Sequence, residues 1–166
     1  MKAIVAVDKK WGIGKKNGLL FSLPEDMKFF RSNTLNKVCV MGYNTLLSFP
    51  ESKPLKNRVN IVLAPDTVTR DDVIVTHTLK ELSKVLKNYD TDDVFVIGGA
   101  MFYSTMLRYC SEVYVTKVDA DGGAEVFYPN LDEDKRFTCV SEGETIKTNG
   151  YDIKFTVYKN NAVEEF

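Results

Sequence analysis

Residues 14–30 read GKKNGLLFSLPEDMKFF, a glycine-containing loop that runs into the start of a helix, and the rest of the chain is organised around them. Pro24 suits the first helical position, because its fixed φ and missing N–H cost nothing there. Asp26 and Phe30 are four residues apart and share one helix face. A carboxylate in an apolar cleft has a raised pKa and can handle protons near neutrality. From this stretch alone, the simpler interpretation is that Asp26 complements the helix dipole.

The length and composition of the chain limit its class. Its 166 residues are enough for one domain with a real core, and the net charge of −1 provides no general field for nucleic acid or an anionic membrane. We expect one domain at 1–160, a frayed tail at 161–166, and neither nucleic acid nor a membrane as a partner. The three cysteines lack metal-ligand spacing, so we expect free thiols and no metal site. The apolar run 3–7 is too short for a signal peptide, and we therefore expect a cytoplasmic protein.

Short apolar runs alternate with helical patterns along most of the chain. The runs predict buried strands at 3–7, 37–41, 58–63, 73–75, 93–97 and 112–118. The patterns between them predict helices at 24–33, 43–47, 78–87 and 101–109. Further alternation predicts an antiparallel pair, 137–142 with 151–159, joined through Asn149-Gly150. Together these elements predict an α/β fold with a mostly parallel sheet and an antiparallel end.

Two glycine turns stand directly after buried strands. Gly98-Gly99 follows the strand at 93–97, and Gly42 follows the strand at 37–41. Glycine lets a phosphate approach the backbone, and the helix that begins there supplies N–H groups and positive potential. Ligands of α/β sheets bind beyond the carboxyl ends of the strands. The two turns could therefore hold the two phosphates of a dinucleotide, although neither is a GxGxxG fingerprint or a P-loop.

Taken together and in order, the motifs resemble dihydrofolate reductase over nearly the whole chain. The matching segments are 4–8 (IVAVD), 12–14 (GIG), 23–30 (LPEDMKFF), 33–34, 40–42, Thr45, 54–55 with Arg58, 60–63, 96–100 (VIGGA), Tyr103, 114–116 and 127–129. The resemblance implies a dihydrofolate reductase-like fold, a twisted, mixed eight-stranded sheet, mostly parallel with an antiparallel C-terminal edge, flanked by four main helices. It also implies hydride transfer from a reduced nicotinamide to C6 of 7,8-dihydrofolate with protonation at N5, which supports one-carbon and thymidylate metabolism.

The resemblance assigns Asp26 as the acid of the pterin pocket. A carboxylate can accept two parallel hydrogen bonds from the ring N3 and the 2-amino group, and can support proton delivery to N5 through water. Thr116 would bond on the carboxylate side of this contact. Arg58 would hold the α-carboxylate of the glutamate tail, a bidentate task that suits arginine. The apolar walls would come from Met27, Phe30, Phe49, Leu55 and Ile97, with Ile4, Val5 and Ala6 beneath.

The resemblance assigns NADPH to the glycine turns and to the loop at 9–23. This loop would be a mobile flap over the nicotinamide that excludes water from the hydride path. The expected contacts near the flap are Ala6, Ile13, Gly14, Asn17 and Leu19. The other expected cofactor contacts are Gly42, Tyr43, Asn44, Thr45, Leu63, Ala64, Pro65, His77, Ile97, Gly98, Gly99, Ala100, Met101, Phe102 and Tyr103.

Several positions depart from the family pattern. Phe21 stands where a tryptophan is usual, so it keeps a ring but loses the indole N–H that helps to order a water near the pterin. Trp11 comes too early in the loop to replace it. This change concerns the water network and the catalytic rate, not the reaction class.

The cations that usually hold the 2′-phosphate of NADPH are replaced by Tyr43 and Met101. The segment 64–66 (APD) replaces a serine or threonine, and its acid would repel a phosphate but could accept from a free ribose hydroxyl. His77, when protonated, could compensate in part, and Arg70 is a further candidate cation. We therefore expect NADPH as cofactor with a weakened preference over NADH.

Two other functions remain open at this stage. A pyrimidine-intermediate reductase of riboflavin synthesis would share the fold and cofactor, but would not need Asp26 in a pterin pocket or Arg58 at its mouth. A non-catalytic nucleotide-binding module could also keep this fold. For the preferred function we expect dihydrofolate as substrate, antifolates such as methotrexate as ligands, and a monomer.

Overall fold

Two β-sheets and four α-helices form the regular structure of the computed structural model, which describes residues 1–16 and 18–166. The main sheet contains β1 (Lys2–Val7), β3 (Val38–Gly42), β4 (Val59–Leu63), β5 (Ile74–Thr76), β6 (Val94–Val96), β7 (Glu112–Val118), β9 (Phe137–Glu142), β10 (Ile146–Thr148) and β11 (Tyr151–Asn160). The small sheet pairs β2 (Gly12–Gly14) with β8 (Val126–Phe127). The helices are α1 (Pro24–Thr34), α2 (Tyr43–Ser48), α3 (Leu79–Leu86) and α4 (Ala100–Met106). Short 3-10 turns occur at Pro50–Ser52, Thr91–Asp93, Leu107–Tyr109 and Leu131–Glu133.

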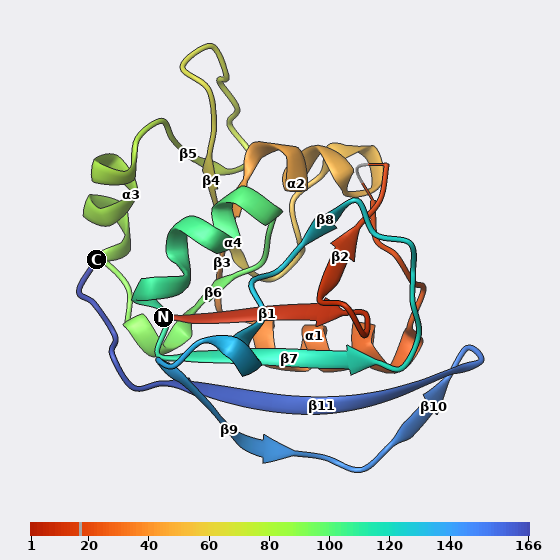
Figure 1. Cartoon of the computed structure of the whole chain (residues 1–166). Coiled ribbons are helices and arrows are strands. Elements are labelled where there is room, and N and C mark those ends of the chain that lie inside the picture. The colour runs from red at the N-terminus through yellow and green to blue at the C-terminus, as the bar shows by residue number, and fades with distance from the viewer. Residues whose placement is uncertain (17) are drawn as a thin grey trace.

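The strand order of the main sheet is β10-β11-β7-β1-β6-β3-β4-β5 (Figure 1). All neighbours from β7 to β5 run parallel, and β11 lies antiparallel to β7. The short strands β9 and β10 pair with different halves of the outer edge of β11, so they share one position in the sheet. The mixed, mostly parallel sheet of eight positions with four flanking helices confirms the expected fold class.

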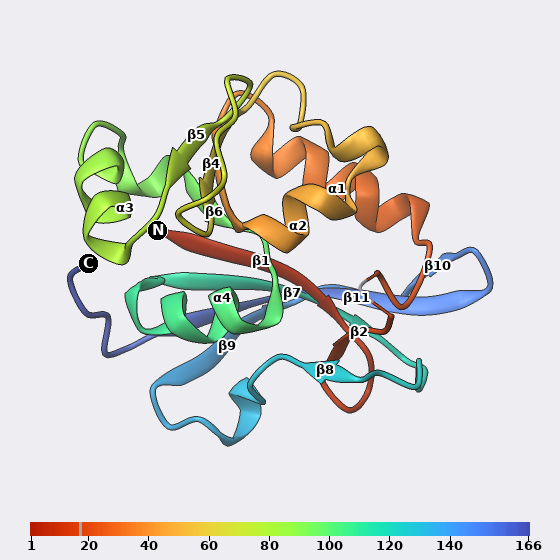
Figure 2. The same ribbon diagram turned by 90° about the horizontal axis from the view of Figure 1, so that it is seen from above.

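Helices cover both faces of this sheet (Figure 2). Residues of α3 and α4, such as Leu82 and Met106, share a buried cluster with Val113 and Val115 of β7. Tyr114 points to the other face, since side chains alternate along a strand. There the ring of Phe29, from α1, lies 6.3 Å from that of Tyr114. α1 and α4 therefore lie on opposite faces of the strands that carry the site.

Three of the expected elements differ from the structure. The loop at 9–23 contains β2, because its glycine segment pairs with β8. The turn at Asn149-Gly150 joins β10 to β11, and not the strand at 137–142 to β11. The tail at 161–166 lies outside helices and strands, yet Glu164 N donates to the Arg108 carbonyl at 2.9 Å and the ring of Phe166 lies 4.8 Å from that of Tyr109. The tail is thus held at these points, and the domain boundary at residue 160 stays a prediction.

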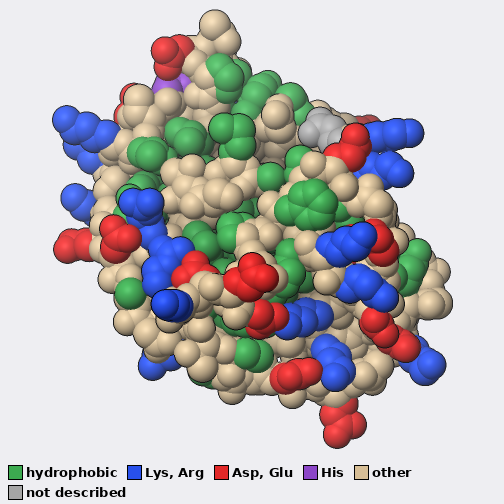
Figure 3. All heavy atoms as spheres, in the orientation of Figure 1, with side chains coloured by type: hydrophobic (Ala, Val, Ile, Leu, Met, Phe, Trp, Pro, Cys, Tyr) green, Lys and Arg blue, Asp and Glu red, His purple; other side chains and the backbone are tan. Residues whose placement is uncertain are grey.

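Acidic, basic and apolar side chains are interspersed over the face drawn in Figure 3, which also carries exposed apolar side chains near its centre. Among the residues described, no helix combines the length and the hydropathy that a bilayer crossing requires.

The buried carboxylate of Asp8 fixes the loop that follows β1. Its Oδ1 accepts from Lys10 N at 2.9 Å and Gly12 N at 2.7 Å, and its Oδ2 accepts from Gly122 N at 3.0 Å. Gly12 is required at this approach, because an added Cβ would lie 2.3 Å from Ala124 Cβ. One side chain therefore joins the base of the 9–23 loop to the loop at 119–125.

We expect Asp8→Ala to lower the free energy of unfolding by about 2–3 kcal/mol, because it leaves buried N–H groups without their charged acceptor. Urea denaturation measures this change. Asp119→Ala is the matched control, since its side chain is 77% exposed and lies 3.7 Å from Lys9 Nζ, and it should change stability by less than about 0.5 kcal/mol. Equal effects of the two substitutions would contradict the role of Asp8.

Candidate active site

Asp26 lies in the first turn of α1 and faces the end of β7. Thr116 Oγ1 donates a hydrogen bond of 2.6 Å to Asp26 Oδ1, and Thr116 itself is 1% exposed. Partial burial raises the pKa of Asp26 above the ordinary aspartate value, while the hydrogen bond from Thr116 favours the carboxylate and limits this rise. Asp26 is thus a half-buried acid bonded to the sheet, which differs from the surface acid favoured by the local sequence alone.

A cavity of about 340 Å³ opens beside this carboxylate. Its size lies in the range of small-ligand sites, and its walls are mostly apolar. The lining residues come from β1, the 9–23 loop and α1, and are Ala6, Ile13, Leu19, Leu20, Phe21, Ser22, Leu23, Asp26 and Met27. The structure therefore brings Asp26, Met27 and Ala6 together around one cavity, with two of the expected flap residues, Ile13 and Leu19, in the same lining.

The start of α1 is held by the β10–β11 hairpin. Thr148 Oγ1 accepts from Glu25 N at 3.3 Å, and Asn149 Nδ2 donates to the Ser22 carbonyl at 2.9 Å. The residue before the helix, Leu23, provides no side-chain cap. Thr148 thus satisfies a free N–H one residue before Asp26, a contact that sequence reasoning missed because the partners are far apart in the chain.

The two glycine turns meet at the carboxyl ends of β3 and β6. Gly42 N donates to the Gly98 carbonyl at 2.9 Å. An added Cβ would lie 3.0 Å from Thr45 Oγ1 at Gly98 and 3.4 Å at Gly99. Gly98 also has a φ of +139°, which side chains rarely adopt. The starts of α2 and α4 therefore lie side by side, and the lack of a side chain at Gly98 and Gly99 lets Thr45 of α2 pack closely against the second turn.

The expected cofactor residues of α4 differ in exposure. Met101 is 87% exposed, whereas Phe102 and Tyr103 are buried in the core. Tyr103 OH donates to the Ile4 carbonyl at 2.7 Å and so ties α4 to β1. The side chains of Ile4 and Val5 are buried too, and neither residue is among those that line the cavity.

The remaining expected wall residues lie outside the lining of the cavity. Arg58 extends over the ring of Phe30, with its Cζ 5.9 Å from the ring centroid. Its Nε is buried and has no partner within the described part of the chain. Phe49, Leu55 and Ile97 pack against a buried cluster formed by Cys39, Met41, Leu46, Val62 and Ala64. The Nε of Arg58 is therefore a buried donor without a protein acceptor, beside the ring of Phe30.

The residues expected around the adenosine follow β4. Ala64 is buried and its carbonyl lies 3.1 Å from His77 Nδ1, while Pro65 and Asp66 are exposed. Gly42, Tyr43, Thr45 and Leu63 are half-buried and Asn44 is exposed. Arg70 is not a free cation, because its guanidinium donates to both carboxylate oxygens of Asp72, at 2.9 and 2.6 Å.

Aromatic residues of the 9–23 loop take different places. The ring of Phe21 lines the cavity and packs edge-to-face on Tyr151 at 4.8 Å. Trp11 is buried between Tyr128 and Tyr158, away from the cavity lining, in agreement with its early position in the loop. Asn17 lies outside the described residues.

Comparison with known proteins identifies the family of this architecture. A family model described as dihydrofolate reductase matches residues 1–160. Dihydrofolate reductase of Schistosoma mansoni is 33% identical over 95% of this chain and 95% of that protein. The Bacillus subtilis (strain 168) enzyme is 31% identical over 94% of this chain and 92% of that protein. A solved structure of dihydrofolate reductase from Enterococcus faecalis, complexed with NADP(H) and RAB-propyl, has a TM-score of 0.84 at 28% identity, covering 96% of this chain and 95% of that chain.

The position of Asp26 predicts a specific pH dependence. The protonated acid can support protonation of a bound ligand, so turnover should fall as the pH rises through the raised pKa of Asp26. Thr116→Val removes the hydrogen bond that favours the carboxylate, which should raise the pKa further and move this fall to higher pH. The pH profile of kcat measures both effects, and an unmoved profile in a folded Thr116→Val variant would contradict the coupling.

We expect Asp26→Asn to lower kcat at neutral pH by about a hundredfold or more, with partial recovery at low pH, where the substrate is already protonated. Glu25→Gln is the matched control, because this neighbouring acid pairs with the exposed Lys28 at 3.4 Å instead of facing the cavity. Turnover of the wild-type order in Asp26→Asn at neutral pH would exclude the role of this acid.

Proposed function

We infer that this chain, which belongs to the dihydrofolate reductase family, reduces 7,8-dihydrofolate to 5,6,7,8-tetrahydrofolate with NADPH as the hydride donor. The single observation that supports this best is the half-buried Asp26, bonded to Thr116 beside an apolar cavity and near two apposed glycine turns. The family model, the curated relatives and the structural neighbour do not favour the pyrimidine-intermediate reductase or a non-catalytic module.

In the proposed pterin site, Asp26 accepts hydrogen bonds from N3 and the 2-amino group of the ring. Thr116 already occupies Oδ1 on the sheet side and keeps the carboxylate oriented. The nicotinamide cofactor supplies a hydride to C6 when bound, and Asp26 supports proton delivery to N5 through water. Apolar residues of the cavity lining, such as Ile13 and the buried Leu23, keep water from the reacting atoms and so strengthen these polar contacts.

In the proposed tail site, Arg58 binds the α-carboxylate of the glutamate. Its buried and unpartnered Nε supports this role, because such a group normally has a partner. The ring of Phe30 beneath the guanidinium limits its orientations. Phe49, Leu55 and Ile97 supply the apolar wall for the segment between pterin and tail.

The proposed cofactor site uses the glycine turns for the phosphates and the segments 63–65 and 100–103, with His77, for the adenosine. We propose a weakened preference for NADPH over NADH, because the charge expected at the 2′-phosphate is largely missing. Tyr43 and Met101 carry no charge, Asp66 is exposed and acidic, and the charge of Arg70 is balanced by Asp72. A cytoplasmic location and a monomeric state remain predictions from the sequence.

Two assays test the function directly. In the first assay, addition of dihydrofolate should cause oxidation of NADPH, which is measured as a loss of NADPH absorbance. In the second, methotrexate should bind tightly and stop this reaction. A pyrimidine-intermediate reductase would show neither response, because its substrate lacks the pterin and the glutamate tail. Absence of both responses in the folded protein would overturn the assignment.

Restoring the missing cations should strengthen the preference for NADPH. The double substitution Tyr43→Arg with Met101→Arg should raise the ratio of kcat/KM for NADPH over NADH by about tenfold or more, since guanidinium groups bind phosphate in a charge-assisted way. Tyr43→Phe is the uncharged control and should leave the ratio nearly unchanged. A wild-type ratio above about a few hundredfold would contradict the weakened preference.

A further inference from the structure

The turn after α2 has an unfavourable backbone. Glu51 and Ser52 are consecutive non-glycine residues with φ values of 57° and 53°. Side chains rarely adopt this left-handed region, so the surrounding contacts must hold it. Two come from the turn itself, since Ser52 N donates to the Phe49 carbonyl at 2.8 Å and Ser52 Oγ donates to the Leu47 carbonyl at 3.2 Å. Lys53, which is exposed, also forms an ion pair with Glu51, with Nζ 2.8 Å from Oε2.

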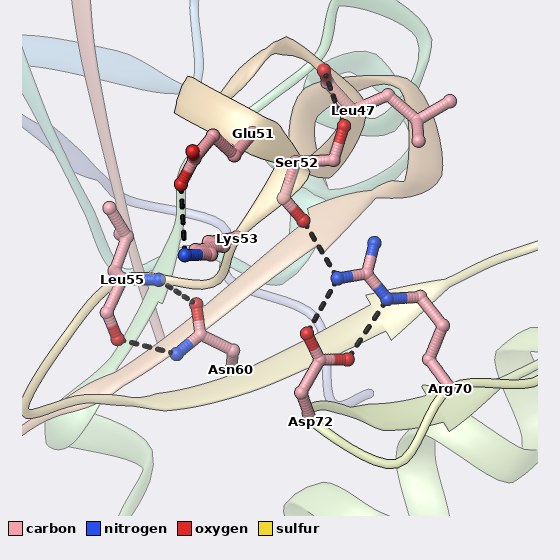
Figure 4. Close-up of polar contacts among 8 residues, drawn as sticks. All are labelled: Leu47, Glu51, Ser52, Lys53, Leu55, Asn60, Arg70 and Asp72. Atoms are coloured by element: carbon pink, nitrogen blue, oxygen red, sulfur yellow. Dashed lines mark hydrogen bonds and ion pairs between the residues drawn. The ribbon is translucent and has the colours of Figure 1, made fainter.

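Arg70 is the contact that reaches this turn from another loop (Figure 4). It belongs to the loop at 64–73 between β4 and β5. Its Nη2 donates to the Ser52 carbonyl at 2.7 Å, while Nε and Nη2 donate to the two carboxylate oxygens of Asp72. Because a guanidinium is planar, the Asp72 fork fixes the direction in which Nη2 points.

The turn separates two residues of the proposed substrate wall. Phe49 precedes it and Leu55 follows it, and both pack half-buried against the cluster around Met41. The Asn60 side chain holds Leu55 at both backbone atoms, accepting from its N at 3.0 Å and donating to its carbonyl at 2.9 Å. Packing therefore anchors Phe49 and Leu55, Asn60 also holds the backbone of Leu55, and Arg70 holds the turn between them.

We propose that Arg70, held by Asp72, is a positioning residue for the folate site. It acts on this site from the loop at 64–73, the start of which is assigned to the adenosine of the cofactor. The proposal rests on the proposed function, which assigns Phe49 and Leu55 to the substrate and the start of this loop to the adenosine. In this role Arg70 does not bind the cofactor phosphate. It holds the strained turn in the one geometry that places both wall residues, so its loss weakens folate binding and leaves the reacting atoms unchanged.

The test compares Arg70→Met, which keeps the length of the side chain but removes its donors, with the wild-type chain. KM for dihydrofolate and Kd for methotrexate should rise by about tenfold, the effect of one charge-assisted hydrogen bond. kcat should stay within about twofold, because Asp26 and Thr116 lie on α1 and β7. The NADPH/NADH ratio should also stay unchanged, whereas a phosphate-binding arginine would lower it.

Three further variants control this result. Arg70→Lys keeps one charged donor group and should recover part of the affinity for methotrexate. Asp72→Asn weakens the two hydrogen bonds that orient Arg70, so it should lower this affinity less than Arg70→Met does. Lys53→Met removes the exposed ion pair of the same turn and should have no effect, since such pairs contribute little. Circular dichroism checks that each variant is folded. If Arg70→Met does not fold, the methotrexate affinities of Arg70→Lys and Asp72→Asn test the proposal instead.

The proposal is overturned if the folded Arg70 and Asp72 variants bind methotrexate as tightly as the wild type, or if they change the NADPH/NADH ratio but not KM for dihydrofolate. A wild-type chain that neither turns over dihydrofolate nor binds methotrexate would instead remove the proposed function itself. The two failures are therefore distinguishable in the same set of assays.

Discussion

The hydrogen bond from Thr116 to Asp26 joins a helix to the centre of the sheet, and the arrangement of the site depends on it. Thr116 stands on β7 directly beside Ala6 of β1, so the carboxylate is placed at the strands that line the cavity. The antiparallel edge of the sheet supports the same helix. Phe29 of α1 stacks on Phe155 of β11 at 4.1 Å, and Thr148 of β10 bonds the first turn of α1. A carboxylate held in this way stays oriented at a partly apolar site, where its proton affinity is raised.

The parallel half of the sheet carries the two glycine turns of the proposed cofactor site. β3 and β6 are neighbours, so the glycine turns that follow them meet through the bond between Gly42 and Gly98. The 9–23 loop lies over the cavity that contains Asp26, and its base is fixed by Asp8. The topology thus places an acid, a mostly apolar cavity and two apposed glycine turns at the carboxyl ends of the central strands, where ligands of α/β sheets bind.

Strong local patterns allowed much of the fold to be predicted. The strand at 112–118 has the expected bounds, and the helix expected at 78–87 forms as α3, where Thr78 Oγ1 caps its start by accepting from Glu81 N at 3.1 Å. The strands β2, β8 and β10 were missed because they have two or three residues each, too few for a period to show. β2 and β8 form because each is the distant partner of the other, whereas β10 pairs with β11 across the turn at Asn149-Gly150.

The site shows the same division. The glycine turns, Asp26 and its neighbour Thr116 were found from motifs and the family resemblance. The bond from Glu25 N to Thr148 was missed, because Thr148 belongs to a short strand far along the chain. Arg70 had been a candidate phosphate ligand. Its pairing with Asp72 lies within one loop, whereas its bond to the Ser52 carbonyl depends on how two loops approach each other. The most direct test of the account is a carbon-13 NMR titration of the Asp26 carboxyl group, with and without methotrexate. The account predicts a midpoint above the value of about 3.9 found in peptides that changes when methotrexate binds. An ordinary midpoint that the ligand does not change would contradict it.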